Sequence, residues 1–261
     1  MCIRDRYNVN TEAIQVERGA NSGVATILVK QSTGERAVFF ERSTATEPEF
    51  LDTHKQLIGS AYILHINGRH RQLMRSAMAV AKEVGTIISL DGGAQRYDED
   101  MKPITEASHI VIVARDYAEK YTGTTNLEDA CRIIHERGAC IAGVTDGANG
   151  SYFVWPDGTS YRCEQFTQAT VVDTTGAGDS FHGAFLANLV HTINHMKGQD
   201  TTSTTKHDRA SIHAVELLKA CAHSDLEKAA IFASAVASLN TQGIGGRSPL
   251  PTLKSVQELI G

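Results

Sequence analysis

Short runs of β-branched and apolar residues alternate with segments of helical periodicity along the middle of this chain, and this alternation constrains the fold most strongly. Residues 71–84 carry apolar side chains at helical spacing, and a strand-like run follows at residues 86–91. Further apolar runs lie at residues 110–113 and 139–144, separated by a helix that Asn126 can cap. Strands separated by helices of about 10 to 15 residues are typical of βαβ units. The sequence therefore predicts an α/β fold, with a mostly parallel sheet flanked by helices on both faces.

Two hairpins are predicted outside this pattern. Residues 24–29 and 37–40 are rich in β-branched or aromatic residues and bracket a turn at residues 32–35, which indicates a small β-strand lid. Residues 151–154 and 159–162 flank a Pro-Asp-Gly turn and predict an antiparallel hairpin at the edge of the sheet.

The chain divides into two parts at the end of the first hairpin. Residues 1–44 are expected to hold the partial β lid and an N-terminal remnant, and residues 45–261 the α/β core. Within the core, residues 191–213 turn polar and cannot bury enough apolar surface to fold alone, so we expect an exposed insertion there. The helical pattern resumes at residues 226–239.

The charge balance argues against two classes of partner. The 25 Lys and Arg residues are outnumbered by 30 Asp and Glu, and the basic residues form no cluster that could hold a nucleic-acid backbone. No window approaches the ~18 apolar residues that a membrane span needs, and residues 1–6 lack the apolar core of a secretory signal. We therefore expect a cytoplasmic protein that binds small molecules.

The strongest chemical signal is the segment Asp-Thr-Thr-Gly-Ala-Gly-Asp at residues 173–179, which opens a helix. Glycines there let a polyanion approach the backbone, and free N–H groups at a helix N-terminus point at it along the helix dipole. Asp179 stands beside this cradle, where it can accept a proton from an attacking hydroxyl while the cradle stabilises a transferring phosphoryl group. A plainer interpretation stays open, in which Asp179 only complements the helix dipole and the glycines only form a tight turn.

Two other nucleotide-binding patterns fit less well. The Gly-Ala-Gly run is two thirds of the dinucleotide fingerprint G-x-G-x-x-G, but Phe181 occupies the third glycine position and the motif lies late in the chain. The chain has no G-x-x-x-x-G-K-[ST] P-loop. A dinucleotide-dependent oxidoreductase and a P-loop nucleotidase are therefore disfavoured.

Residues 173–181 resemble the C-terminal signature of the ribokinase-type (PfkB) carbohydrate kinases, and the resemblance extends over nearly the whole chain. Further segments follow in the family's order: Gly34-Glu35-Arg36, His65-Ile66-Asn67-Gly68-Arg69, Asp91-Gly92-Gly93, Thr145-Asp146-Gly147-Ala148-Asn149-Gly150 and Gln242-Gly243-Ile244-Gly245-Gly246. Within the family, the nearest branch is similar to ketohexokinase and its bacterial sugar-kinase relatives. The resemblance implies a ribokinase-like fold and transfer of the γ-phosphate of ATP to a sugar hydroxyl.

The resemblance also implies the roles of particular residues. Asp179 would be the catalytic base that takes the proton from the sugar hydroxyl and contacts the substrate, and Gly176, Ala177 and Gly178 would form the anion hole.

The positions that match the family's nucleotide and cation sites lie in two turns. Thr145, Gly147 and Gly150 would lie beside ATP, while Asp173 and the carbonyl of Thr175 match positions that bind a monovalent cation such as K⁺. Mg²⁺ would arrive with ATP and keep much of its water shell.

Candidate contacts to the sugar lie in the lid and at the ends of strands. His65 and His70 flank a Gly-Arg turn that could border a substrate cleft at the carboxyl ends of the strands, where open α/β sheets bind ligands. Asp91 shares that location, but it could equally cap the turn that follows it. Arg36 could cover the sugar from the lid or simply face solvent. Strand lids in this family often pair across dimers, so a homodimer through the lid is also expected.

Two departures from the family's pattern stand out. Many members carry an Asn-x-x-Glu motif after a core strand, where this chain has Ala114-Arg115-Asp116-Tyr117, so help to Mg²⁺ from that motif is in doubt. The family's opening strand and its Gly-Gly/Asn substrate signature should precede the first hairpin, and only a short unfamiliar stretch does so here. We therefore expect that the chain is N-terminally incomplete, that residues 1–6 are an artefact of reading frame or assembly, and that much of the sugar site lies upstream. A non-catalytic nucleotide- or sugar-binding paralogue, or an inactive fragment, is the alternative.

Overall fold

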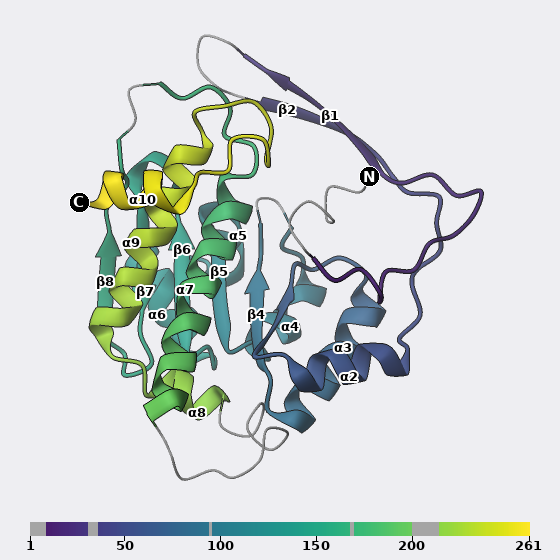
Figure 1. The fold of residues 1–261 in the computed structure, drawn as a ribbon, viewed down its shortest axis with the longest axis horizontal. Coiled ribbons are helices and arrows are strands. Elements are labelled where there is room, and N and C mark those ends of the chain that lie inside the picture. Colours follow the sequence, from purple (N-terminus) through teal and green to yellow (C-terminus); the bar gives the residue numbers. More distant parts are fainter. Residues whose placement is uncertain (1–8, 31–35, 94–95, 168–169, 200–213) are drawn as a thin grey trace.

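A six-stranded sheet forms the centre of the computed structural model, which describes residues 9–30, 36–93, 96–167, 170–199 and 214–261 (Figure 1). Strands β3 to β6 are parallel, and β7 and β8 extend the sheet as the expected antiparallel hairpin. The strands lie side by side in chain order: β3 Ile63–Ile66, β4 Ile87–Asp91, β5 Ile110–Ala114, β6 Ile141–Thr145, β7 Ser151–Val154 and β8 Ser160–Cys163. The prediction of a mostly parallel α/β sheet is confirmed.

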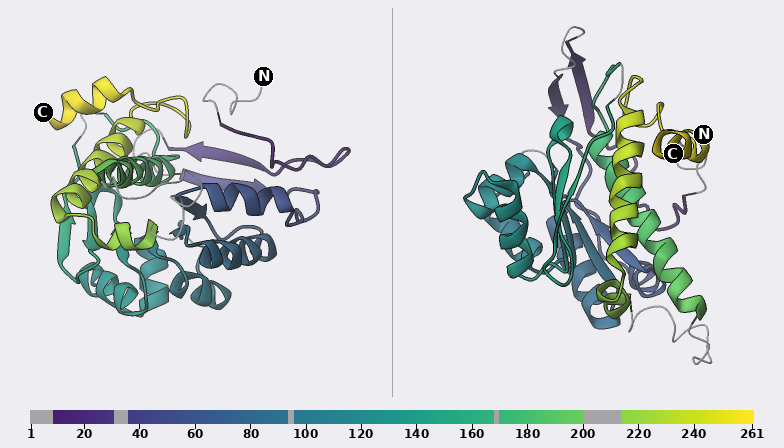
Figure 2. Two further views of the ribbon diagram at one scale, coloured as in Figure 1. Left: turned by 60° about the horizontal axis from the view of Figure 1, so that its bottom comes forward. Right: turned by 90° about the vertical axis from the view of Figure 1, so that its left-hand side faces the viewer.

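Helices cover both faces of the sheet, as the edge-on view in Figure 2 shows. Side chains of a strand alternate between the two faces, so on β5 Val111 and Val113 join one apolar cluster while Ile110 and Ile112 join the other. The first cluster packs against α2 Asp52–Ser60, α3 Arg71–Val84, α4 Lys102–Glu106, α5 Arg115–Thr122 and α6 Leu127–Glu136. The second packs against α7 Ala177–Gln199, α8 Ala214–Lys219, α9 His223–Asn240 and α10 Leu253–Ile260. Short 3₁₀ turns lie at η1 Glu99–Met101 and η2 Gly147–Asn149.

The expected cap of α6 and the predicted insertion have different outcomes. The Asn126 side chain accepts hydrogen bonds from the amides of Glu128 and Asp129, at 3.0 and 3.2 Å, so the cap is confirmed. Helix α7, however, continues through the first part of the predicted insertion, because Ile193 is fully buried in the second apolar cluster. Residues 200–213 lie outside the described part of the chain.

The N-terminal hairpin forms its own two-stranded sheet, away from the core (Figure 1). Strands β1 Val24–Val29 and β2 Arg36–Glu41 pair antiparallel as expected, while the turn at 32–35 is not among the described residues. Large apolar side chains on it face solvent, including Leu28, Phe39 and Phe40, each at least half exposed. In the described ranges, no helix has the length and apolar character to cross a bilayer.

Candidate active site

The turn before α7 is held by one buried carboxylate. Asp173 accepts a hydrogen bond from the amide of Thr175 at 2.8 Å and another from the amide of Gly245 at 2.9 Å. It thereby ties the turn to the loop that follows α9. Gly176 has φ +80°, and a Cβ there would lie 2.5 Å from the Cα of Gly246, so only glycine fits this close approach of two backbone segments.

At the start of helix α7, two backbone amides have protein acceptors and two have none among the described residues. The amide of Ala177 donates to the Thr174 carbonyl at 3.3 Å, and that of Ser180 donates to the Gly176 carbonyl at 2.8 Å. Between them, the amides of Gly178 and Asp179 find no acceptor among the described residues, and both residues are exposed. A free helix N-terminus of this kind can bind an anion.

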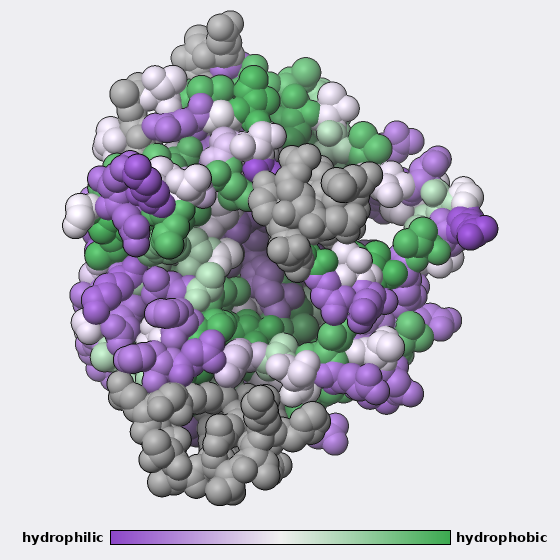
Figure 3. Space-filling model, viewed as in Figure 1, coloured by the Kyte–Doolittle hydropathy of each residue, from purple (hydrophilic) through white to green (hydrophobic). Residues whose placement is uncertain are grey.

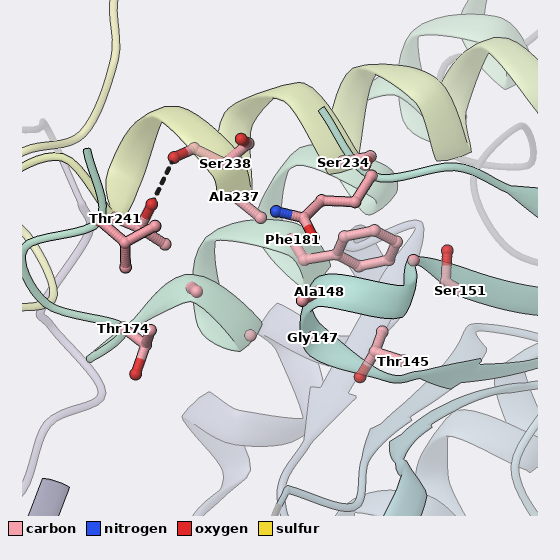
Figure 4. Close-up of a pocket in the computed structure, with 15 residues that line it drawn as sticks. Thr145, Gly147, Ala148, Ser151, Thr174, Phe181, Ser234, Ala237, Ser238 and Thr241 are labelled. Carbon is pink, nitrogen blue, oxygen red and sulfur yellow. Dashed lines mark hydrogen bonds between the residues drawn. The ribbon is translucent and has the colours of Figure 1, made fainter. Parts of the chain in front are cut away.

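A pocket of about 270 Å³ lies beside this helix start (Figure 4). The turn after β6 forms one wall, the start of α7 another and α9 a third. Its lining residues are Thr145, Gly147, Ala148, Gly150, Ser151, Gln165, Val171, Thr174, Ala177, Gly178, Phe181, Ser234, Ala237, Ser238 and Thr241. The structure thus brings all three residues predicted for ATP together with two of the three predicted for the anion hole.

The α9 wall is the part of the pocket that sequence analysis missed. Ser234, Ala237, Ser238 and Thr241 follow one another at helical spacing, and Thr241 Oγ1 donates to the Ser238 carbonyl at 2.7 Å (Figure 4). Small residues at helical spacing leave room beside a helix. This pattern was the sequence signal that could have indicated a pocket wall on α9.

An ion pair fixes the turn after β6 from its outer side. The Arg115 guanidinium, at the start of α5, binds both carboxylate oxygens of Asp146, and Asn149 donates to the same carboxylate at 2.9 Å. The hydrogen bonds from Arg115 are the main reason why the pKa of Asp146 lies below its usual value, although partial burial opposes the shift. In the segment that corresponds to the family's Asn-x-x-Glu motif, Ala114 stands at the Asn position and the buried Tyr117 at the Glu position.

A second group of polar residues lies near the start of α7 but does not line this pocket. Asp91 ends β4 and accepts a hydrogen bond from the Gly93 amide at 2.7 Å, so it caps the turn that follows it, while its contact with the sugar stays a prediction. His182 Nε2, from α7, lies 3.4 Å from Asp91 Oδ1, and the ring of His65 lies 5.6 Å from that of His182. The charge of Asp179 acts on both imidazoles, so this carboxylate lies on the same side.

Burial controls the protonation of these imidazoles. It lowers the pKa of His182 and, to a smaller extent, that of His65, while the carboxylates of Asp91 and Asp179 oppose the shift. Figure 3 shows a hollow with hydrophilic side chains at its floor over β4. Arg36 begins β2, but the structure does not describe its side chain, so its contact with the sugar stays a prediction.

Comparisons with known proteins bear on the family and the fold of the chain. Residues 4–253 match the family model described as pfkB family carbohydrate kinase. Probable fructokinase-2 of Arabidopsis thaliana is 28% identical over 208 residues, which are 72% of this chain and 61% of that protein. The ribokinase of Giardia lamblia superposes with a TM-score of 0.79 at 17% identity, over 98% of this chain and 76% of the other. The Vibrio cholerae fructokinase, solved with fructose, ADP and calcium ion, gives 0.70 at 18% identity, over 99% and 79%.

The chain belongs to the PfkB family of carbohydrate kinases, because the family model spans most of its length. The ribokinase-like fold is likewise confirmed by the superpositions. The finer likeness to ketohexokinase stays a prediction, since these relatives are named fructokinase and ribokinase.

Proposed function

We propose that this chain transfers the γ-phosphate of ATP to a hydroxyl group of a small sugar. The observation that carries the proposal is the junction of a nucleoside-sized pocket with the free amides of Gly178 and Asp179. The nucleoside would lie between the turn after β6 and α9, next to Thr145, Gly147 and Gly150. The polyphosphate would then extend along the start of α7, past Gly176, Ala177 and Gly178, where the amides of Gly178 and Asp179 find no acceptor among the described residues.

The transfer itself needs a base and a stabiliser of charge. Asp179 would take the proton of the sugar hydroxyl, whose oxygen forms the new bond to the γ-phosphorus while the bond to the bridging oxygen of ADP breaks. The amides would offset the charge on the transferring group, and a phosphate-bound Mg²⁺ would supply further charge neutralisation. The exposure of Asp179 in the first turn of α7 supports this assignment, because an acceptor hydroxyl can reach it.

A monovalent cation such as K⁺ fits the oxygen atoms at the turn before α7. Thr175 Oγ1 and Asn240 Oδ1 are buried and find no hydrogen-bond partner in the described part of the chain, while the Asp173 carboxylate lies in the same turn. Asn240 Nδ2 donates to the carbonyl of Thr175 at 3.3 Å, so the two residues are in contact. Oxygen ligands of this kind suit a hard cation. Asp173 and Thr175 would hold the ion, which would add positive charge behind the anion hole.

The acceptor is proposed from the relatives. Two of the relatives are named fructokinase and ribokinase, which supports a ketose or aldose with a free hydroxyl as the acceptor. Asp91 would contact the sugar, and Arg36 would approach it from the lid. The homodimer through the lid and the cytoplasmic location also remain predictions.

The experiment is a coupled assay of ADP release with a panel of ketoses and aldoses, for the wild type and for Asp179→Asn. Loss of the base should lower kcat by about 10²–10⁴-fold while ATP binding, measured by calorimetry, stays within a few fold. Asp225→Asn is the matched control, because this carboxylate also lies in the first turn of a helix, but that helix is α9 and not α7. If Asp179→Asn retains turnover within tenfold, the base assignment is wrong. ATP binding without any turnover by the wild type would favour the non-catalytic alternative.

A further inference from the structure

A second cluster of ligand-type side chains lies at the carboxyl edge of the parallel strands. His65 comes from β3, Asp91 from the end of β4 and His182 from the second turn of α7, and one ligand atom of each lies within 4.8 Å of the other two. None of the three lines the pocket beside α9. The proposed ATP site therefore leaves this cluster unused.

Neither ring nitrogen of the buried imidazole in this cluster makes a hydrogen bond of good geometry to a described residue. The side chain of His182 is 5% exposed, and its Nδ1 finds no partner among the described residues. Its Nε2 lies 3.4 Å from Asp91 Oδ1, which is longer than the roughly 2.7–3.2 Å of a good N–H···O bond. Buried polar groups in native proteins nearly always have a partner, and an orphaned one commonly marks a water or an ion.

The same distance suits a metal ion. Bonds of about 2.0–2.1 Å from Zn²⁺ to nitrogen and oxygen put two ligand atoms of a tetrahedral site roughly 3.3–3.4 Å apart. The Gly93 amide already donates to Asp91 Oδ1 at 2.7 Å, which holds the carboxylate in place as outer hydrogen bonds do in metal sites. His65 is exposed, so an ion can enter from its side.

We propose that His65, Asp91 and His182 bind one Zn²⁺ ion, with the fourth position open to water. Two imidazoles and one carboxylate form a ligand set that suits Zn²⁺ better than Mg²⁺ or Ca²⁺, which take oxygen ligands. Binding at this site does not depend on the proposed kinase activity. If that activity holds, the ion would lie close to the carboxylate of Asp179. Its positive charge would make that carboxylate a poorer proton acceptor, so Zn²⁺ would inhibit the transfer.

Calorimetric titration of the metal-free chain with Zn²⁺ tests the site, and the absorption of Co²⁺ bound in place of Zn²⁺ reports its coordination. We expect one tight site per chain and the intense visible bands of tetrahedral Co²⁺. His65→Ala should weaken the tight site at least about tenfold and remove the Co²⁺ bands. His65 is the sharpest position to change, because it is exposed while His182 is buried and its replacement could unfold the chain.

His191→Ala is the matched control, since this histidine is exposed on the same helix as His182. It should leave both the tight site and the Co²⁺ spectrum unchanged, and thermal unfolding should show that each variant is folded. Asp91→Asn supplies a second test, because an amide is a much poorer ligand for Zn²⁺ than a carboxylate. Equal Zn²⁺ affinity in the wild type, His65→Ala and Asp91→Asn would overturn the proposal, as would Co²⁺ without tetrahedral bands. Neither result would bear on ATP binding or turnover.

Discussion

Two turns border the pocket beside α9, and different forces hold them in place. The turn before α7 depends on a buried carboxylate and on direct contact between two backbones, at Gly176 and Gly246. The turn after β6 depends on an ion pair in which the Arg115 side chain is 42% exposed. Interior packing tolerates almost no added atoms, whereas exposed ion pairs contribute little. The turn that carries the proposed chemistry should therefore be the more sensitive of the two.

The largest effect on stability is expected for Gly176→Ala. The positive φ strains any residue with a Cβ, and the added carbon would lie 2.5 Å from the Cα of Gly246. Together, strain and overpacking should lower the free energy of unfolding by about 3 kcal/mol, measured by urea denaturation.

Gly178→Ala is the matched control, because its φ is not positive and a Cβ there meets nothing within 4 Å. It should change the free energy of unfolding by less than about 1 kcal/mol. A Gly176→Ala chain that is as stable as Gly178→Ala would mean that the two backbones do not pack as closely as described.

Much of the fold could be predicted because burial imposes a period on the sequence. β4 and β5 are buried over nearly their whole length, and α3 buries one face of four residues, so each leaves a clear apolar pattern. α2 is different, because Ile58 is its one buried residue, and β3 likewise has one buried residue, Ile66. These elements leave a weak pattern, and the sequence analysis did not predict them.

The candidate site divides in the same way. The turn before α7 is one continuous segment, so its residues could be recognised together. The pair Arg115 and Asp146 lies 31 residues apart, and the contact between Asn240 and Thr175 spans 65. His182 meets Asp91 only because α7 crosses the end of β4. Such contacts depend on how the elements pack, so the spacing of residues within one segment does not predict them.

A smaller effect is expected for Asp173→Asn. An amide keeps one oxygen acceptor but presents an NH₂ group to one of the two amides that the carboxylate now accepts, at Thr175 or Gly245. One N–H of this partly buried turn would be left without a partner, which should lower the free energy of unfolding by about 2 kcal/mol.

Asp157→Asn is the control for that substitution. Asp157 also accepts from the backbone amide two residues later, that of Thr159 at 3.0 Å, but in an exposed turn where water can replace the lost partner. Its replacement should lower the free energy of unfolding by less than about 1 kcal/mol. Equal losses for the two variants would show that Asp173 does not anchor the turn.

The smallest effect is expected for Arg115→Gln, and its pH dependence identifies the force involved. Because Arg115 is partly exposed, solvent screens the pair, and the loss at neutral pH should not exceed about 1 kcal/mol. The pKa of Asp146 is lowered in the folded chain, so the pair stabilises the fold above the unfolded value of about 3.9 and ceases to do so as pH falls through the lower, folded value. The difference in free energy of unfolding between wild type and variant should thus be constant between pH 7 and pH 5 and vanish in more acidic solution.

Arg132→Gln is the control, because it breaks an exposed pair on a helix surface with Glu128 and Asp129. It should lower the free energy of unfolding at neutral pH by less than Arg115→Gln does. A difference for Arg115→Gln that persists below the folded pKa of Asp146 would mean that the arginine stabilises the turn by packing, and the contrast between the two turns would then be one of degree rather than of kind.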